Sequence, residues 1–385
     1  MQYTEYELGE LLPFEQPTAY IVKSTDYSDA YATPVLTAGK SFILGKTNET
    51  DGVFDQLPVI IFDDFTTATQ FVNFRFKVKS SAMKILHINT DLVIPKYIFY
   101  RLQIIQFDHS THKRYWIQSY SKIKVLIPPL DEQFRIVARI EELFSELDKA
   151  VDTLKTTKEQ LAVYRQAVLK DAFDNAQAMC ERFTPIEELL VTDRKGMSTG
   201  PFGTMLKKHE HKTTGVPMLG IENIDSGKFI DGNKIFVTPE KAAELKSFAL
   251  KSGDIIISRS GTVGELCVVP PRMEGALLST NLMRVSLDCQ KVLPEYFIYL
   301  FQSKGIVLDQ VKELCKGSTR IFLNQTILKQ IQFPIPNVHE QLQIINTIES
   351  RLTFCDNIEK TVDTALAQAD AMRQSILKQS FEGKI

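Results

Sequence analysis

Apolar residues recur at spacings of three and four along two long stretches of the chain, a pattern typical of coiled-coil helices. Pro128 and Pro129 prevent a helix before the first stretch, Asp131 is placed to cap it, and no Pro or Gly follows until Pro185. Two amphipathic helices on separate cores would look similar, but helices of this length usually pair, here antiparallel if the chain is symmetric. The predicted seam consists of Ile136, Ile140, Leu143, Leu147, Leu154, Leu161, Val168, Ile344, Ile348, Ile358, Val362, Met372 and Ile376.

Shorter apolar runs outside these stretches predict strands. LPVIIFDD (57–64) and FVNFRFKVK (71–79) are strand-like, and SGDIIISRSGTVGEL (252–266) combines a buried strand with a glycine-containing turn. We therefore expect an α/β (α+β) fold, in which two β-rich domains are joined by two long antiparallel coiled-coil helices. The expected domains are 1–127 and 181–335, and the expected helices are 128–180 and 336–385.

The two halves of the chain repeat one plan. IKVLIPPLDEQFRIVARIE at 123–141 matches IQFPIPNVHEQLQIINTIE at 331–349, a separation of 208 residues. The same separation relates RQAVLKDAFD at 165–174 to RQSILKQSFE at 373–382. Stacked-repeat proteins have periods of roughly 20 to 50 residues, so this much longer period indicates a duplicated domain pair with an internal pseudo-twofold repeat.

The charge balance excludes a globally basic nucleic-acid binder, because 45 Lys and Arg residues are matched by 47 Asp and Glu residues, for a net charge of −2. The predicted helices carry the acidic excess, and the remaining segments are mildly basic. Mildly basic domains suit contact with phosphates, whereas acidic helices suit contact with proteins.

The cysteines and the N-terminus bear on the compartment. Five cysteines without CxxC spacing argue against a disulfide framework or a thiolate zinc site. The N-terminal sequence MQYTEYELGELLPFEQ has no Lys or Arg before an apolar stretch, so we expect no signal or transit peptide. Since no run of about 18 apolar residues occurs either, the expected location is the cytoplasm.

Motifs of common enzyme classes are absent from the sequence, which contains no GxxxxGK[ST], GxGxxG, HExxH or GxSxG. His209-Glu210-His211 and the pair His109 and His112 could begin metal sites, but they lack Cys or carboxylate partners at ligand spacing, which favours solvated loops. Asp63-Asp64 follows an apolar strand as a nuclease carboxylate pair would, although a turn explains it at least as well.

Basic and hydroxyl side chains cluster in loops at comparable places in both halves. Lys and Arg can bind phosphates or guanine edges, and Ser and Thr can bind either. One such cluster alone is most often a solvated loop, but their recurrence before the strand that leads into each long helix favours DNA contact. The candidate DNA-binding residues are Lys40, Lys46, Thr66, Thr67, Lys113, Arg114, Lys207, Lys208, His209, Arg259, Ser260, Lys316, Ser318, Thr319 and Arg320.

Taken together, these motifs resemble the specificity subunit of type I restriction-modification systems, over essentially the whole chain. The I-P-x-x-x-E-Q motif occurs at 127–133 and 335–341, each long helix ends in RQxxLKxxF, and PVLTAGKSFILG with PVIIFDD resembles one class of target recognition domain. The resemblance implies a non-catalytic subunit of a system for defence against foreign DNA. Its two target recognition domains would each read one half of a split double-stranded DNA target across a helical spacer.

The resemblance also implies partners. Two methyltransferase (M) subunits would bind this chain, and restriction/translocase (R) subunits would join them for cleavage. S-adenosylmethionine, ATP and magnesium would act on those partners, with no cofactor or metal on this chain.

Two other functions stay open on the sequence alone. A metal-dependent nuclease built on Asp63-Asp64 predicts that the purified chain cuts DNA with magnesium. A coiled-coil scaffold predicts no salt-sensitive DNA binding, even with a methyltransferase partner present. A methyltransferase is disfavoured, because the chain contains neither a glycine-rich cofactor motif nor an [DNS]PP[YFW] loop.

Overall fold

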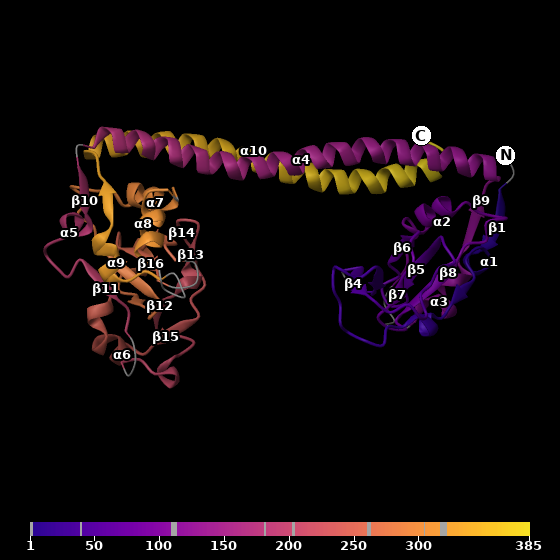
Figure 1. Cartoon of the computed structure of the whole chain (residues 1–385), viewed down its shortest axis with the longest axis horizontal. Coiled ribbons are helices and arrows are strands. Elements are labelled where there is room, and N and C mark those ends of the chain that lie inside the picture. Colours follow the sequence, from indigo (N-terminus) through magenta and orange to yellow (C-terminus); the bar gives the residue numbers. More distant parts are fainter. Residues whose placement is uncertain are drawn as a thin grey trace. The chain divides into compact units, whose positions relative to one another are not determined.

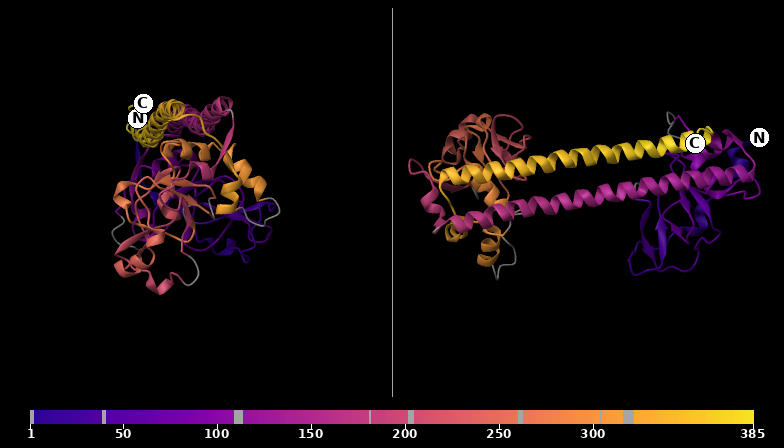
Figure 2. Two further views of the ribbon diagram at one scale, coloured as in Figure 1. Left: turned by 90° about the vertical axis from the view of Figure 1, so that its left-hand side faces the viewer. Right: turned by 90° about the horizontal axis from the view of Figure 1, so that it is seen from above.

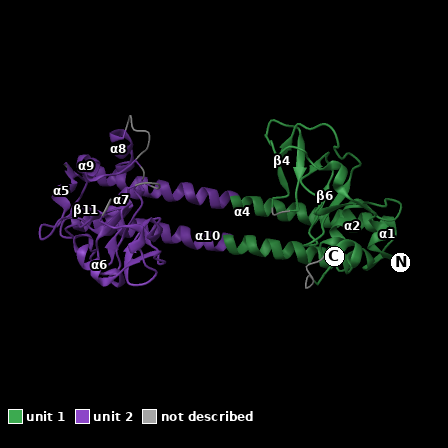
Figure 3. Ribbon diagram, turned by 90° about the horizontal axis from the view of Figure 1, so that it is seen from below, with its two compact units in different colours: residues 1–155, 363–385 green, residues 156–362 purple. Residues whose placement is uncertain are grey.

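The computed structural model describes residues 3–38, 41–108, 114–180, 182–201, 205–259, 263–303, 305–315 and 322–385. The chain forms two compact units (Figure 3): unit 1 combines 1–155 with 363–385, and unit 2 is 156–362. Each unit contains one β-rich part and a stretch of both long helices. The long helices therefore belong to the units, whereas the sequence suggested helices separate from the domains.

Unit 1 contains a four-stranded antiparallel sheet in the order β2-β8-β5-β6, of which β5, β6 and β8 are labelled in Figure 1. A three-stranded sheet, β4-β3-β7, combines an antiparallel and a parallel pair, and β1 pairs with β9. The strands are β1 (Thr4–Glu7), β2 (Phe14–Glu15), β3 (Thr33–Leu36), β4 (Ile43–Thr47), β5 (Val59–Asp63), β6 (Thr69–Val72), β7 (Lys77–Val78), β8 (Met83–His87) and β9 (Lys124–Ile127). The short helices are α1 (Leu8–Leu11), α2 (Pro95–Leu102) and α3 (Tyr115–Gln118).

Unit 2 repeats this topology strand for strand: β11-β19-β16-β17 corresponds to the four-stranded sheet, β15-β12-β18 to the three-stranded sheet and β10-β20 to the strand pair. A hairpin, β13-β14, is added. The strands are β10 (Phe183–Pro185), β11 (Met197–Thr199), β12 (Val216–Leu219), β13 (Ile224–Asp225), β14 (Lys228–Phe229), β15 (Ile235–Val237), β16 (Ile255–Ser258), β17 (Leu266–Val268), β18 (Leu277–Leu278), β19 (Leu282–Val285) and β20 (Gln332–Pro334). The short helices are α5 (Ile186–Leu189), α6 (Pro239–Glu244), α7 (Pro294–Gln302), α8 (Val307–Leu314) and α9 (Gln325–Gln330).

One inner strand of each four-stranded sheet, β5 in unit 1 and β16 in unit 2, is buried on both faces. This explains the continuous apolar sequence of both strands. In β5, Ile60 and Phe62 join one hydrophobic cluster, and Ile61 joins the cluster on the opposite face. In β16, Ile255 and Ile257 belong to one hydrophobic cluster, and Ile256 belongs to the cluster on the opposite face. Two cores per β-rich part therefore fix the strand in place, because a shift by one residue would exchange every side chain between the faces.

The long helices α4 (Leu130–Met179) and α10 (Val338–Phe381) lie side by side and antiparallel within each unit (Figure 2). In unit 1, Arg373 pairs with Asp148, and Leu377 packs further back along α4 against Ile140 and Phe144. In unit 2, Arg165 pairs with Asp356 at 2.7 Å and Asp171 pairs with Arg351 at 3.3 Å. Residue numbers therefore rise along α4 as they fall along α10, as in an antiparallel pair. No helix in the described residues is long and apolar enough to cross a membrane.

Most of the predicted seam positions are shielded from solvent. The buried ones are Ile140, Leu161, Val168, Ile344, Ile348 and Val362. The half-buried ones are Ile136, Leu143, Leu147, Leu154, Ile358 and Ile376. The exposed sides of both helices carry charged residues, as expected for a coiled-coil pair, together with exposed apolar residues such as Phe134, Val163 and Phe354.

Met372 is the exception, and its prediction as a seam residue is wrong. Its side chain is 54% exposed, whereas the neighbouring Arg373 is half-buried. The Arg373 guanidinium lies 4.4 Å from the centre of the Phe144 ring and pairs with Asp148. A cation–π contact combined with an ion pair places the arginine stem in the interface and turns Met372 toward solvent.

The two helices begin differently, and the predicted cap of α4 is also wrong. Helix α4 starts at Leu130, so Asp131 lies in its first turn, where its charge still favours the positive end of the helix dipole. Helix α10 has a reciprocal capping box. Asn337 accepts a hydrogen bond from the Glu340 amide at 3.0 Å, and the Glu340 carboxylate accepts one from the Asn337 amide at 3.0 Å.

A fully buried glutamine ties each long helix to its own β-rich part. In unit 1, Gln133 accepts a hydrogen bond from the Ile94 amide at 2.8 Å and donates to the carbonyls of Leu92 at 3.0 Å and Pro128 at 2.9 Å. All three partners are main-chain groups. The contact therefore depends on the path of the backbone and not on the side chains of the β-rich part.

Gln341, at the equivalent position of the repeat, makes the same three bonds in unit 2. It accepts from the Leu293 amide at 2.8 Å and donates to the carbonyls of Lys291 and Pro336, each at 2.8 Å. We call each set of three bonds the glutamine latch. The latch gives a physical reason for the glutamine that closes both I-P-x-x-x-E-Q motifs.

Candidate nucleic-acid interface

Loops of unit 2 meet at the end of β16, around Arg259. Its amide donates to the carbonyl of Asn281 at 3.0 Å, and its carbonyl accepts from the Leu323 amide at 3.1 Å. Its guanidinium donates through Nε to the Leu323 carbonyl and through Nη1 to the Thr280 carbonyl, each at 3.3 Å. This half-buried arginine therefore joins two loops while part of its guanidinium stays available.

The turn at Gly200 and Pro201 forms a third side of this cluster. The Thr280 hydroxyl donates to the Pro201 carbonyl at 2.8 Å, and the Gly200 amide donates to the Leu282 carbonyl at 3.2 Å. A Cβ atom on Gly200 would lie 1.9 Å from the Ser279 carbonyl oxygen, so only glycine fits there. We call Gly200, Pro201, Arg259, Thr280 and Leu323 the unit 2 junction.

Unit 1 has the same backbone arrangement at the end of β5. The Asp64 amide donates to the Ala82 carbonyl at 3.4 Å, and the Asp64 carbonyl accepts from the Tyr115 amide at 3.0 Å. Since Asp63 pairs with Met83 as Ser258 pairs with Leu282, Asp64 occupies the position of Arg259. We call Asp64, Ala82 and Tyr115 the unit 1 junction.

The side chain at this shared position differs between the units. The Asp64 carboxylate is buried, accepts a hydrogen bond from the Trp116 amide at 2.8 Å and pairs with the Lys84 ammonium at 3.3 Å. Arg259, in contrast, keeps a solvent-accessible surface. The two units thus keep one backbone framework and place different chemistry on it.

Three of the predicted DNA-contact residues border the unit 1 junction. Thr66 and Thr67 lie in the turn after β5, where the Thr66 hydroxyl donates to the Asp63 carboxylate at 2.6 Å and the Thr67 amide to the Asp63 carbonyl at 2.9 Å. Arg114 is exposed and directly precedes Tyr115. The signal that predicted them, basic and hydroxyl residues clustered in loops, therefore selected residues that lie together.

Lys207, Lys208 and His209 lie in a different place, beside α6. The Glu210 carboxylate pairs with the Lys241 ammonium at 2.9 Å and accepts from the Lys207 amide at 2.6 Å. The bond from Lys241, followed by the bond from the Lys207 amide, holds the pKa of Glu210 below its ordinary value. Because Lys241 neutralises Glu210, the exposed side chains of Lys207 and Lys208 keep their own charge available.

Of the remaining candidates, the structure describes Lys46 alone. Lys46 is half-buried in β4. Seven candidates lie outside the described residues: Lys40, Lys113, Ser260, Lys316, Ser318, Thr319 and Arg320.

The carboxylates of the nuclease alternative are engaged in structural contacts. Asp63 accepts hydrogen bonds from the Phe65 amide at 2.9 Å and from the Thr66 hydroxyl, as a turn-forming aspartate does. Asp64 is paired with Lys84. Across the part of the chain that the structure describes, no three His, Cys, Asp or Glu side chains gather as a metal site requires; His109 and His112 lie outside that part.

Exposed Thr280 and Asn281 at the unit 2 junction were not predicted. Their hydroxyl and amide groups are of the kind that bind phosphates and base edges. The available signal was the polar triplet Ser279-Thr280-Asn281, which separates two apolar strand segments just as the predicted loops do.

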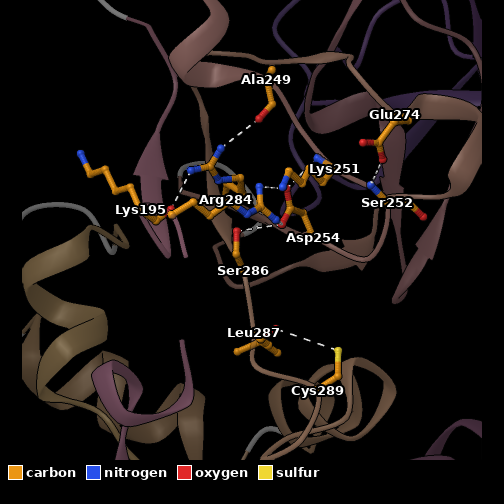
Figure 4. Close-up of polar contacts among 11 residues, drawn as sticks. Lys195, Ala249, Lys251, Ser252, Asp254, Glu274, Arg284, Ser286, Leu287 and Cys289 are labelled. Carbon is orange, nitrogen blue, oxygen red and sulfur yellow. Dashed lines mark hydrogen bonds and ion pairs between the residues drawn. The ribbon is translucent and has the colours of Figure 1, made fainter. Parts of the chain in front are cut away.

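A buried charged network in unit 2 was also missed (Figure 4). The Asp254 carboxylate accepts hydrogen bonds from the Arg194 guanidinium and, at 2.7 Å, from the Ser286 hydroxyl. Arg284 donates to the carbonyls of Ala249 at 2.9 Å and Lys195 at 2.8 Å, and burial lowers the pKa of its guanidinium. The network holds the turn that carries exposed Lys195 against the sheet. Its signal was Arg284 itself, a charged residue within an apolar strand.

Comparisons with known proteins agree with this architecture. A family model described as the type I restriction modification DNA specificity domain matches residues 202–368. The chain is 31% identical over 367 residues to the EcoR124I/EcoR124II specificity subunit of Escherichia coli, and the match covers 91% of this chain and 87% of that protein.

Two solved structures share the fold. A chain from a study of complex assembly and conformational transition of the type I R-M system aligns with a TM-score of 0.68 at 15% identity, covering 100% of this chain and 98% of that one. The HsdS subunit from Thermoanaerobacter tengcongensis aligns with a TM-score of 0.52 at 16% identity, covering 100% and 97%. These matches confirm the predicted fold of two β-rich domains and two long helices. Together with the sequence identity to the Escherichia coli protein, they establish that this chain belongs to the specificity subunits of type I restriction enzymes.

Proposed function

We propose that this chain gives a type I restriction-modification complex its DNA specificity. The β-rich part of unit 1 reads one half of a split target, the β-rich part of unit 2 reads the other, and the long helices set the spacing. The observation that supports this most strongly is the repeated backbone framework with different side chains at its junctions, Asp64 in one and Arg259 in the other. Such a framework can read two different base sequences with one mode of docking.

The chemistry is supplied by partners. Two methyltransferase subunits bind this chain, and restriction/translocase subunits join them, bringing S-adenosylmethionine, ATP and magnesium. The absence of a methyltransferase cofactor motif from the sequence supports this division of labour. The complex acts on DNA in the cytoplasm.

The direct test is a genome-wide map of methylated bases in cells with and without the gene for this chain. We expect one bipartite motif to lose its methylation on deletion and to regain it on complementation. An unchanged methylation map in cells that express the partner subunits would reject the proposed function.

Replacing both Lys207 and Lys208 with Ala is expected to weaken DNA binding by the assembled complex. Removing one lysine that binds a phosphate reduces the slope of log K against log salt by about one, so the slope of the double variant should fall by up to about two. Binding titrations at several salt concentrations measure the slope.

The matched control replaces both Lys291 and Lys329 with Ala. It removes the same amount of charge, but from two residues whose side chains contact α5. Its salt slope should stay at the wild-type value. If the Lys207/Lys208 variant also kept the wild-type slope, this surface would not contact phosphates.

A further inference from the structure

The loop between β5 and β6, residues 64–68, carries an exposed aromatic ring. Phe65 is 48% exposed, although the strand that precedes the loop is buried along its whole length. Strand β6 is the outer strand of its sheet, and a two-stranded ribbon of this kind fits the major groove of DNA. Exposure of one apolar side chain is ordinary in itself, so the case for Phe65 depends on how the loop is built.

Hydrogen bonds fix this loop residue by residue. The Asp63 carboxylate accepts from the Phe65 amide at 2.9 Å and from the Thr66 hydroxyl at 2.6 Å. The Asp63 carbonyl accepts from the Thr67 amide at 2.9 Å, and its amide donates to the Ala68 carbonyl at 2.8 Å. Thr67 has a φ of 58°, which β-branched residues rarely adopt and which is found most often at functional sites. The backbone that carries the ring is therefore ordered before a partner binds, which lowers the entropic cost of binding.

A cation and a second apolar side chain lie beside this loop. The Tyr115 amide donates to the Asp64 carbonyl at 3.0 Å, so the adjoining residues, exposed Arg114 and Phe65, are close in space. Ile117, three residues after Arg114 and on the same side of α3, is 52% exposed. This combination suits DNA, because an arginine can bind a phosphate while the apolar groups contact bases.

The equivalent place in unit 2 is polar. The unit 2 junction exposes Thr280, Asn281 and part of the Arg259 guanidinium. Hydroxyl, amide and guanidinium groups recognise bases by hydrogen bonds to their edges, which a phenyl ring cannot form. The feature of the major groove that an apolar side chain recognises is the C5-methyl group of thymine. The two units therefore offer different kinds of base recognition on the same backbone framework.

We propose that Phe65 is a specificity-determining residue that packs against the methyl group of a thymine in the half-site of unit 1, while Arg114 binds a nearby phosphate; this rests on the proposed function. The contact removes water from both the ring and the methyl group. Exchange of this A·T pair for G·C removes the methyl group, so the contact selects the base pair that faces the loop.

The test removes only the methyl group. The methylated motif of wild-type cells supplies the target sequence, and each thymine on either strand is replaced in turn by deoxyuridine in a synthetic duplex. Binding by the assembled methyltransferase complex is then titrated. We expect one replacement to weaken binding about fourfold, the effect of losing the burial of one CH₂-sized group. The Phe65→Ala complex should bind the thymine duplex more weakly than the wild type and should not distinguish it from the deoxyuridine duplex.

Two further variants separate the contact from changes in folding. Ile43→Ala is the matched control, since Ile43 is also 48% exposed but lies in β4 of the three-stranded sheet; it should keep the full fourfold effect. Phe65→Leu should keep part of the effect, because leucine is also apolar. Thermal melting of all three variants should match the wild type.

Two results would overturn the proposal: equal binding of the thymine and deoxyuridine duplexes by the wild type at every position, or a fourfold effect that persists in Phe65→Ala. A ring that inserts between base pairs would give the first result, because binding would then depend on Phe65 but not on the methyl group. In both cases the wild-type complex still binds its target specifically. Loss of specific binding by the wild type would instead reject the proposed function.

Discussion

Replacing Gln341 with Leu is expected to destabilise unit 2 by about 2–4 kcal/mol, although Leu has nearly the same volume. The substitution removes three hydrogen bonds that tie α10 to the Leu293 amide and to the carbonyls of Lys291 and Pro336. Because the bond to Pro336 is buried and the other two are partly buried, water can replace them only in part. Leaving a buried polar group without its partner costs about 1–3 kcal/mol.

Thermal unfolding of the full chain measures this effect. We expect the transition of unit 2 to fall by roughly 5–15 °C, given about 2–4 °C per kcal/mol for a part of this size. Gln343→Leu is the matched control, since Gln343 is exposed on the same helix and its variant should stay within about 0.5 kcal/mol of wild type. Equal stability of the two variants would show that the latch does not hold α10 to the β-rich part.

Periodic features of the sequence predicted the fold well. The spacing of Ile140, Leu161 and Ile348 reports a helix face directly, and the apolar runs of β5 and β16 report strands buried on both sides. The repeat added the antiparallel relation of the two helices, because equivalent residues must make equivalent contacts. The helix faces, the buried strands and the pairing of the helices all follow from residue spacing or from the long repeat, and both can be read along the sequence.

Features that depend on competition between neighbouring side chains could not be predicted in this way. Met372 fits the apolar pattern, but Arg373 occupies the interface because Phe144 and Asp148 both attract its guanidinium. Similarly, a cap at Asp131 fits the sequence, yet the helix already begins at Leu130.

The junctions were only partly predictable, because they join segments distant in the sequence. Basic and hydroxyl residues could be selected loop by loop, but the bond from Arg259 to the Thr280 carbonyl appears only in the folded chain. The correspondence between Asp64 and Arg259 was hidden because the two residues have opposite charge. The correspondence follows from the pairing of Asp63 with Met83 and of Ser258 with Leu282, which no sequence pattern indicates.

Exchanging residues 1–127 for the first domain of another family member is expected to change one half of the DNA target completely and leave the other half unchanged. This segment contains every strand of unit 1, from β1 to β9, so the exchange leaves no sheet incomplete. Gln133, which stays with α4, bonds only to the main chain at Leu92, Ile94 and Pro128. The latch can therefore form with a domain of different sequence, provided that its backbone follows the same path.

The measurement that tests this account most directly is the genome-wide methylation motif of cells that express the exchanged chain together with the original methyltransferase subunits. The chain with its own two domains, expressed in the same cells, is the reference. The account predicts a bipartite motif with one new half, the original second half and the original number of base pairs between them. A motif in which both halves changed, or in which neither changed although methylation persisted, would contradict the assignment of one half-site to each unit.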